Sequence, residues 1–227
     1  MCGRYTITPD ITQLVERFKA TVEEHATHEA RYNVAPTTQV PVVAMREGRR
    51  MLRTRRWGLI PHWAKDPSIG SRLINARAET VAKSAAFRDA VRADHRRCLI
   101  PADGFYEWLR EGKERKPFHF RLPDGGLFAF AGLTASWSSK EDPDDVRKTC
   151  TILTTGANAE TSPIHDRMPL ILLPDEEEIW LGTDTDAALA LTMRPEPDGL
   201  LIPRPVSQLV NSVRNQGPEV LADAAAS

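Results

Sequence analysis

The sequence predicts an α+β fold built mainly from antiparallel β-sheets, with a few flanking helices. Many short apolar runs are typical of strands, and few helical stretches lie between them to act as crossovers. The chain has 227 residues, of which 41% are hydrophobic and 27% charged, and it shows no internal repeat and no linker rich in Pro or Gly. Residues 1–227 are therefore expected to form a single domain.

The first expected element is a helix over about Pro9 to Lys19. Thr8 is the candidate N-cap, and Pro9 suits the first turn. Apolar residues recur on one face of this segment, at Ile11, Leu14, Val15 and Phe18.

Later apolar runs are expected to form strands, because each is short and lies between polar or turn-forming stretches. Two further helices are predicted, over Glu79 to Ala93 and from about Asp175, where Pro174 and three consecutive glutamates favour a helix N-terminus. Residues 138–148 read as a polar loop, and the tail from about Ala222 is expected to be disordered. The expected strands are Pro41 to Met45, Met51 to Leu59, Arg97 to Ile100, Phe105 to Leu109, Phe118 to Leu122, Leu127 to Gly132, Cys150 to Thr154 and Pro169 to Leu173.

Composition argues against secreted and membrane proteins. The chain has no signal-peptide pattern and no segment long enough to cross a bilayer, so we expect a cytoplasmic location. Its cysteines, Cys2, Cys98 and Cys150, are too few for a disulfide framework and lack the paired spacing of a zinc site. We expect reduced thiols, with Cys98 and Cys150 in the core, and no metal or organic cofactor.

Charge is distributed unevenly along the chain. Residues 1–122 carry 23 Lys and Arg against 14 Asp and Glu, whereas residues 123–227 carry 7 against 17. A phosphate-binding surface would therefore draw mainly on the first half. The densest basic run extends from Arg46 to Arg56, and it is equally consistent with the solvated side of a strand pair.

Cys2 offers chemistry that an internal cysteine lacks. Once Met1 is removed, Cys2 carries an α-amine and a thiol on adjacent carbons, and this pair converts an aldehyde into an imine and then into a five-membered thiazolidine. The reference pKa of an α-amine, about 7.7 to 8.0, leaves much of it neutral and nucleophilic at physiological pH. Position alone is also consistent with a small apolar residue at the start of a strand.

A series of short motifs accompanies Cys2 along almost the whole chain. They are Met1 to Tyr5, Tyr32 to Pro36, Trp57 to Pro61 with Trp63, Asn75 to Thr80, Arg97 to Pro101, Gly104 to Trp108, Ala131 to Leu133, Ile164 to Pro169 and Asn215 to Glu219. In this order they resemble the SRAP family of abasic-site processing proteins. One departure is Thr134, where the family often has Trp after Ala-Gly-Leu. The resemblance implies an SRAP-type domain whose β-sheets form a barrel-like core.

The resemblance also implies a catalytic group of Cys2, Asn75, Glu107 and His165. Asn75 would hold Cys2 or the opened sugar through its amide. Glu107, with a pKa raised by apolar surroundings, would shuttle protons, and His165 would protonate the sugar oxygen released on ring opening. Taken singly, Asn75 also fits a turn residue before a helix, Glu107 a structural salt bridge and His165 a structural loop histidine.

For DNA, the resemblance implies phosphate contacts from Arg4, Arg77 and Arg167. Trp63 and Pro36 would form a stacking platform and a wedge beside the abasic nucleotide, although a buried core position is an alternative for Trp63. Asn33 and Thr154 complete the expected DNA-binding set.

The implied function is a suicide-type crosslink between Cys2 and the aldehyde of an abasic site in single-stranded DNA, with some lyase activity and with Met1 removed by an aminopeptidase or autocatalytically. The expected protein is a monomer that associates with the nucleoid when bound to DNA. Two alternatives remain open. A cysteine peptidase or N-terminal-nucleophile amidase would use the same residues, and a plain single-strand binder would use the arginine-rich half.

Overall fold

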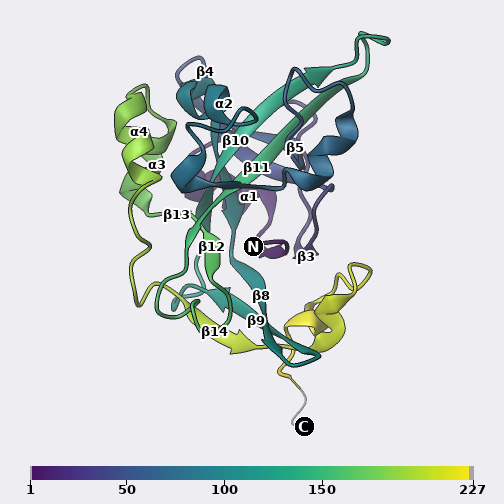
Figure 1. Cartoon of the computed structure of the whole chain (residues 1–227), viewed down its shortest axis with the longest axis vertical. Coiled ribbons are helices and arrows are strands. Elements are labelled where there is room, and N and C mark those ends of the chain that lie inside the picture. Colours follow the sequence, from purple (N-terminus) through teal and green to yellow (C-terminus); the bar gives the residue numbers. More distant parts are fainter. Residues whose placement is uncertain (1, 225–227) are drawn as a thin grey trace.

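The computed structural model describes residues 2–224 and shows an α+β fold dominated by antiparallel sheets (Figure 1), which confirms the predicted class. The expected strands are all present, several of them longer than predicted, and the run from Pro169 to Leu173 is divided between two strands. The strands are β1 (Tyr5–Ile7), β2 (Thr21–Val22), β3 (Arg31–Val34), β4 (Gln39–Arg46), β5 (Arg49–Trp57), β6 (Asn75–Arg77), β7 (Arg97–Ala102), β8 (Gly104–Glu111), β9 (Glu114–Arg121), β10 (Phe128–Ser138), β11 (Val146–Gly156), β12 (Arg167–Pro169), β13 (Ile171–Leu172) and β14 (Ile202–Pro205).

The larger sheet closes into a barrel. Its strands follow the order β12-β11-β10-β7-β4-β5-β2, and β11 also pairs in parallel with β5 through Thr149 to Arg56 and Cys150 to Trp57. This extra pairing joins β5, β4, β7, β10 and β11 in a ring, so the barrel-like core is confirmed. Cys98 and Cys150 are fully buried in that core.

A smaller sheet of order β14-β9-β8-β1-β3 packs against the barrel. Aromatic side chains join the two sheets, because Tyr5 meets both Trp57 and Phe130 edge to face, and Phe105 meets Phe130. The start of the chain therefore lies between the sheets, near the centre of the molecule (Figure 1).

Helices cover only part of the sheets. They are α1 (Ile11–Phe18), α2 (Arg88–Arg92), α3 (Pro174–Leu181) and α4 (Thr185–Leu191), with 3-10 helices at Pro67–Arg72, Ala78–Thr80, Asp94–Arg96, Gln208–Asn211 and Pro218–Leu221. No helix within residues 2–224 is long and apolar enough to cross a membrane.

Two sequence predictions about helices were wrong. Asp10, not Thr8, caps α1, in a capping box with Gln13, because the Thr8 hydroxyl donates to the Asp103 carboxylate instead. The predicted helix from Glu79 to Ala93 is a series of turns that becomes α-helical only in α2.

The polar loop between β10 and β11 is shorter than the predicted range of 138–148, because it covers residues 139–145 and β11 already begins at Val146. The predicted disordered tail begins near Ala222, whose carbonyl accepts from the backbone N–H of Ser207 over 2.9 Å, and Asp223 pairs with Arg204 at 2.6 Å. The rest of that prediction concerns residues 225–227, which lie outside the described residues, as does Met1.

Candidate active site

Cys2 lies where the first strand enters between the two sheets. Tyr5 pairs with Phe105, and the backbone N–H of Tyr106 donates to the carbonyl of Arg4 over 3.0 Å, so the first residues run beside β8. The Cys2 side chain is fully buried. This placement brings Cys2 close to Glu107 on β8.

Asn75 holds the backbone at Cys2. It begins β6, which runs parallel to β11 with Asn75 opposite Ile152. Its side-chain Nδ2 donates to the carbonyl oxygen of Cys2 over 2.8 Å. Its Oδ1 is buried and accepts no hydrogen bond from the described residues, so an acceptor remains beside Cys2 for a donor on the reacting partner.

Glu107 is a buried carboxyl with only 3% of its surface exposed. Burial raises its pKa from an ordinary 4.5 to about 7, which confirms the pKa shift expected from its apolar surroundings. A carboxyl with this pKa gives up and takes back a proton at neutral pH. Its Oε2 lies 4.0 Å from Nε2 of His165.

His165 is oriented by its own loop. The backbone N–H of Arg167 donates to His165 Nδ1 over 3.0 Å, the Asp166 carboxylate lies 3.0 Å from the same nitrogen, and Nε2 faces Glu107. Partial burial lowers the pKa of His165 below its ordinary value. These contacts direct His165 Nε2 toward Glu107 and leave the ring partly exposed to a bound sugar.

The thiol of Cys2 is held in its protonated form. Burial, reinforced by the negative charge of Glu107, raises the pKa of this thiol well above its ordinary value. A thiolate is the reactive form in classical cysteine nucleophiles, and such thiols lie in electropositive surroundings. Cys2 instead lies buried beside the negative charge of Glu107, which disfavours the thiolate.

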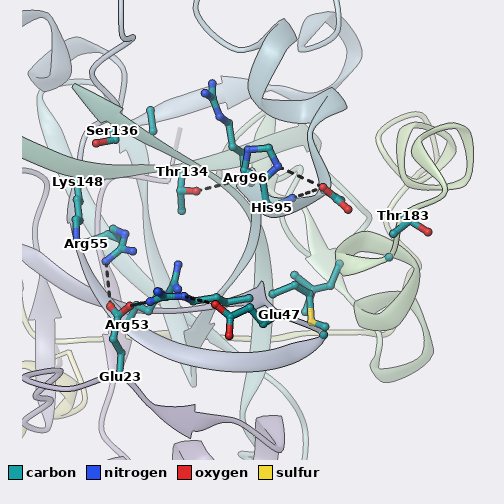
Figure 2. A pocket seen from close by; sticks show the side chains of 17 residues that line it. Glu23, Glu47, Arg53, Arg55, His95, Arg96, Thr134, Ser136, Lys148 and Thr183 are labelled. Atoms are coloured by element: carbon teal, nitrogen blue, oxygen red, sulfur yellow. Dashed lines mark hydrogen bonds and ion pairs between the residues drawn. The ribbon is translucent and has the colours of Figure 1, made fainter. Parts of the chain in front are cut away.

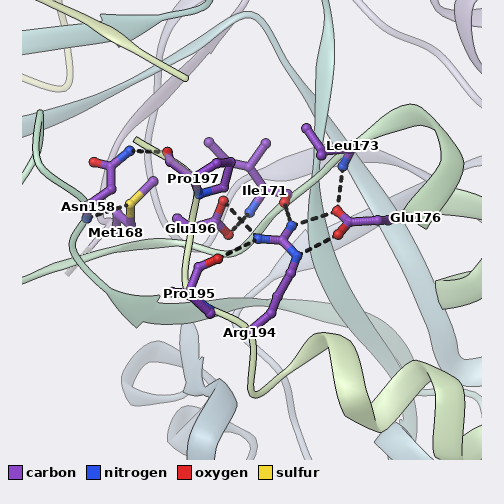
Figure 3. Close-up of polar contacts among 9 residues, drawn as sticks. All are labelled: Asn158, Met168, Ile171, Leu173, Glu176, Arg194, Pro195, Glu196 and Pro197. Atoms are coloured by element: carbon purple, nitrogen blue, oxygen red, sulfur yellow. Dashed lines mark hydrogen bonds and ion pairs between the residues drawn. The ribbon is translucent and has the colours of Figure 1, made fainter. Parts of the chain in front are cut away.

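The His165 loop is braced by the segment that follows α4. Asn158 Nδ2 donates to the carbonyl of Pro197 over 3.0 Å, and the backbone N–H of Ala159 donates to Asp198 over 2.8 Å. Arg194 anchors this segment against β13 and α3 through the carbonyl of Ile171 and the carboxylate of Glu176 (Figure 3). These contacts tie the loop that carries His165 to the segment that follows α4.

Arg167 is hydrogen-bonded to Thr154 and is also paired with the carboxylate of Glu79. Arg167 donates from Nη1 and Nη2 to the two carboxylate oxygens of Glu79 at 2.5 and 3.0 Å, and its Nη2 also donates to the Thr154 carbonyl at 2.5 Å. The Thr154 side chain is fully buried, so its hydroxyl does not face solvent. Glu79 thus occupies the bidentate position that a phosphate would take on Arg167.

Asn33 and Arg4 are also joined. Arg4 Nη1 donates to Asn33 Oδ1 at 2.7 Å and to the carbonyl of Val210 at 2.8 Å, and its guanidinium lies 5.9 Å from the Trp108 ring centre. Asn33 is fully buried, and its Nδ2 donates to three carbonyls of the C-terminal segment, those of Val210, Ser212 and Asn215. Its geometry is that of a residue that positions Arg4.

The remaining predicted DNA ligands lie on the surface. Trp63 is 49% exposed, which rules out the buried alternative, Arg77 is exposed at the end of β6, and Pro36 is half-buried after β3. Sequence reasoning missed Glu79 and Trp108 as partners of the arginines, although both lie within the motifs that flank Arg77 and Glu107. No cluster of three or more His, Cys, Asp or Glu side chains suited to a metal ion occurs within residues 2–224.

Known proteins resemble this chain in sequence and in fold. Residues 1–213 match a family model described as SOS response associated peptidase (SRAP). The chain is 40% identical over 227 residues to the abasic site processing protein YoqW of Bacillus subtilis, covering 97% of this chain and 99% of that protein. It is 30% identical over 228 residues to the abasic site processing protein YedK of Escherichia coli, again covering 97% and 99%. A crystal structure from Bacteroides thetaiotaomicron shares the fold, with a TM-score of 0.87, 24% identity, and coverage of 98% of this chain and 100% of that one.

Proposed function

This chain belongs to the SRAP family, and from that premise we propose that it processes abasic sites in single-stranded DNA through a covalent crosslink to Cys2. The observation that carries the proposal is the convergence of Cys2, Glu107 and His165, with Asn75 holding the Cys2 backbone at 2.8 Å. These groups come from segments far apart in the sequence.

The first step is attack by the α-amine of Cys2 on the aldehyde of the ring-opened abasic sugar, after Met1 has been removed. The carbon–nitrogen bond forms, the carbonyl oxygen leaves as water, and an imine results. Glu107, with a pKa of about 7, gives the proton that water needs to leave and recovers one from the amine. His165 Nε2–H donates to the ring oxygen of the sugar as it opens.

The second step is addition of the Cys2 sulfur to the imine carbon. The thiol proton passes to the imine nitrogen, and a thiazolidine closes with no further loss of atoms. A buried protonated thiol suits this sequence, because the amine reacts first and the sulfur only traps the product. Lyase activity follows from the same imine, since loss of a sugar proton beside it expels the 3′ phosphate by β-elimination.

The strand would bind across the surface that carries Arg4, Arg77 and Arg167. Arg77 is exposed and ready for a phosphate, whereas Arg167 must exchange Glu79 for one. Asn33 and Thr154 support this surface by positioning Arg4 and Arg167. Trp63 and Pro36 would contact the bases beside the lesion. A monomer acting in the cytoplasm on nucleoid DNA is sufficient for this function.

The test is incubation of the protein with three DNA substrates: abasic single strands, the same strands without the lesion, and abasic duplexes. We expect a denaturation-resistant adduct with the abasic single strand only. An adduct that forms equally with the undamaged strand would overturn the proposal, as would binding alone, without an adduct, that is indifferent to the lesion.

A second candidate is a cysteine peptidase or N-terminal-nucleophile amidase, because the matching family model carries the word peptidase in its description. The raised pKa of the buried thiol speaks against thiolate attack on a peptide. Removal of Met1 by the protein itself would be compatible with either candidate. Mass spectrometry separates them, since an acyl group on Cys2 supports the amidase and an attached sugar supports the crosslinker.

Arg77 and Trp63 are expected to contribute to DNA binding in different ways. A plot of log affinity against log salt concentration has a negative slope. Arg77→Gln should make this slope less steep by about 0.7, the value for one lost phosphate contact on a single strand. Trp63→Ala should weaken binding roughly tenfold and leave the slope unchanged, because stacking is not ionic. Fluorescence anisotropy titrations at several salt concentrations measure both. Identical slopes for wild type and Arg77→Gln would remove Arg77 from the phosphate contacts.

A further inference from the structure

The arginine-rich hairpin of β4 and β5 lines a hollow at one end of the barrel (Figure 2). The hollow has a volume of about 750 Å³, and its lining includes Ser136 and Lys148, which pair across β10 and β11, with Lys148 next to Arg55 because β11 also pairs with β5. At about 3.3 Å per residue, β11 covers roughly 20 Å between Lys148 and Thr154. The hollow is therefore separate from the surface that carries Arg167.

Basic groups predominate in this hollow. Arg46, Arg53 and Arg55 all approach one carboxylate, that of Glu23, at 3.4, 3.2 and 3.9 Å. Three guanidinium groups thus surround one carboxylate, and Arg46 also pairs with Glu47 at 3.6 Å. The charged lining consists of Arg46, Arg53, Arg55, Arg96 and Lys148 against Glu23, Glu47 and Asp94.

Two of these arginines are held in an unfavourable environment. Arg55 is only 9% exposed, and its pKa is lowered, first by burial and then by the neighbouring charge of Arg53. Arg53 Nε is buried, and although it lies 3.2 Å from Glu23 it makes no hydrogen bond to the described residues. Like charges brought together with unsatisfied donors are typical of a site for an anion.

We infer that this hollow, the barrel-end site, binds a phosphate-bearing ligand through Arg53, Arg55 and Lys148. Guanidinium groups match phosphate oxygens in bidentate geometry, and the volume is that of a site for a nucleotide-sized molecule. In the unliganded protein Glu23 takes the place of one phosphate. A second hollow continues past Met45 and Gly48 and carries Lys19 and Arg49, so a longer phosphate chain also has a path.

The phosphate has two sources, a free nucleotide or the backbone of a DNA strand, and two probes distinguish them. Adenosine monophosphate is titrated by calorimetry, and a fluorescent ten-residue oligothymidylate without a lesion is titrated by anisotropy. Lys148→Glu should weaken binding of the relevant probe about tenfold, whereas Lys140→Glu, an equal charge reversal on an exposed loop lysine, should not. Loss with the nucleotide identifies a free ligand, and loss with the oligonucleotide alone identifies a strand.

Glu23→Gln should change affinity in the direction opposite to Lys148→Glu, because it removes the carboxylate that competes with the ligand. Affinity for the relevant probe should rise several-fold in Glu23→Gln and fall in Arg53→Gln, whereas a purely structural ion pair would change stability without changing affinity. Equal affinities of the wild type, Lys148→Glu and Glu23→Gln for both probes would overturn the inference. Adduct formation at Cys2 with a short abasic strand serves as an independent measure, and it should be unchanged in all these variants.

Discussion

Cys2→Ala is expected to reduce the denaturation-resistant adduct to less than about one hundredth of the wild-type yield, while leaving a reversible imine that borohydride traps. Loss of the thiol removes the trapping step, but the α-amine of residue 2 remains once Met1 is removed. The measurement is a denaturing gel of the products formed with abasic single-stranded DNA, run with and without borohydride.

Cys98→Ala is the matched control for this substitution. Cys98 is another fully buried cysteine, but it lies on β7 within the barrel and takes no part in the proposed chemistry. We expect its adduct yield to equal that of the wild type. If the two alanine variants behaved alike, a loss in both would be due to packing, and a loss in neither would show that sulfur is not the trap.

Glu107→Gln is expected to slow adduct formation by a factor of about 10² or more, because it keeps the shape of the side chain and removes its exchangeable proton. The wild-type rate should depend on an ionisation near pH 7, the pKa of Glu107, and this dependence should be absent in the variant. Single-turnover rates measured from pH 5 to 9 test both points. Glu177→Gln is the control, since Glu177 is equally buried but pairs with Arg17 and Arg50 away from Cys2.

The same carboxyl affects stability in a predictable direction. Its pKa is raised on folding from 4.5 to about 7, so its contribution is fully present below pH 4.5 and is lost as the pH rises through 7. The free energy of unfolding measured in urea should therefore fall less steeply over this range in Glu107→Gln than in the wild type. Some slope will remain, because burial also raises the pKa of Glu196 to about 7.

Much of the β-structure was predictable because strands here carry local signals, and the failures have physical causes. Val81 and Phe87 are both buried, yet residues six apart lie about 120° from each other around a helix and cannot both face one core. The chain between them forms turns that bury both side chains, despite its good helix formers. Short strands such as β1 and β3 are defined by partners distant in the sequence, so no local pattern marks them.

The candidate site was likewise predictable only in part. Motif order indicated Cys2, Asn75, Glu107 and His165, and local apolarity was enough to predict the raised pKa of Glu107. The orientation of the His165 ring depends on a backbone N–H of Arg167, which only the folded loop brings to Nδ1. Likewise, the burial of Asn33 depends on carbonyls of the C-terminal segment.

The structure separates the arginines of the basic run that the sequence left ambiguous. The run from Arg46 to Arg56 was consistent with a solvated strand pair or with a phosphate surface. Alternation along β5 divides it, since Arg53 and Arg55 point into the barrel-end hollow, whereas Arg50 pairs with Glu177 beneath α1.

The most direct test of the central claim is the intact mass of the protein before and after exposure to abasic single-stranded DNA. The account predicts a starting mass that lacks Met1, and then a single new species equal to the protein plus the strand minus one water. The account would be contradicted by a protein that retains Met1 and still forms the adduct, or by a processed protein whose mass does not change.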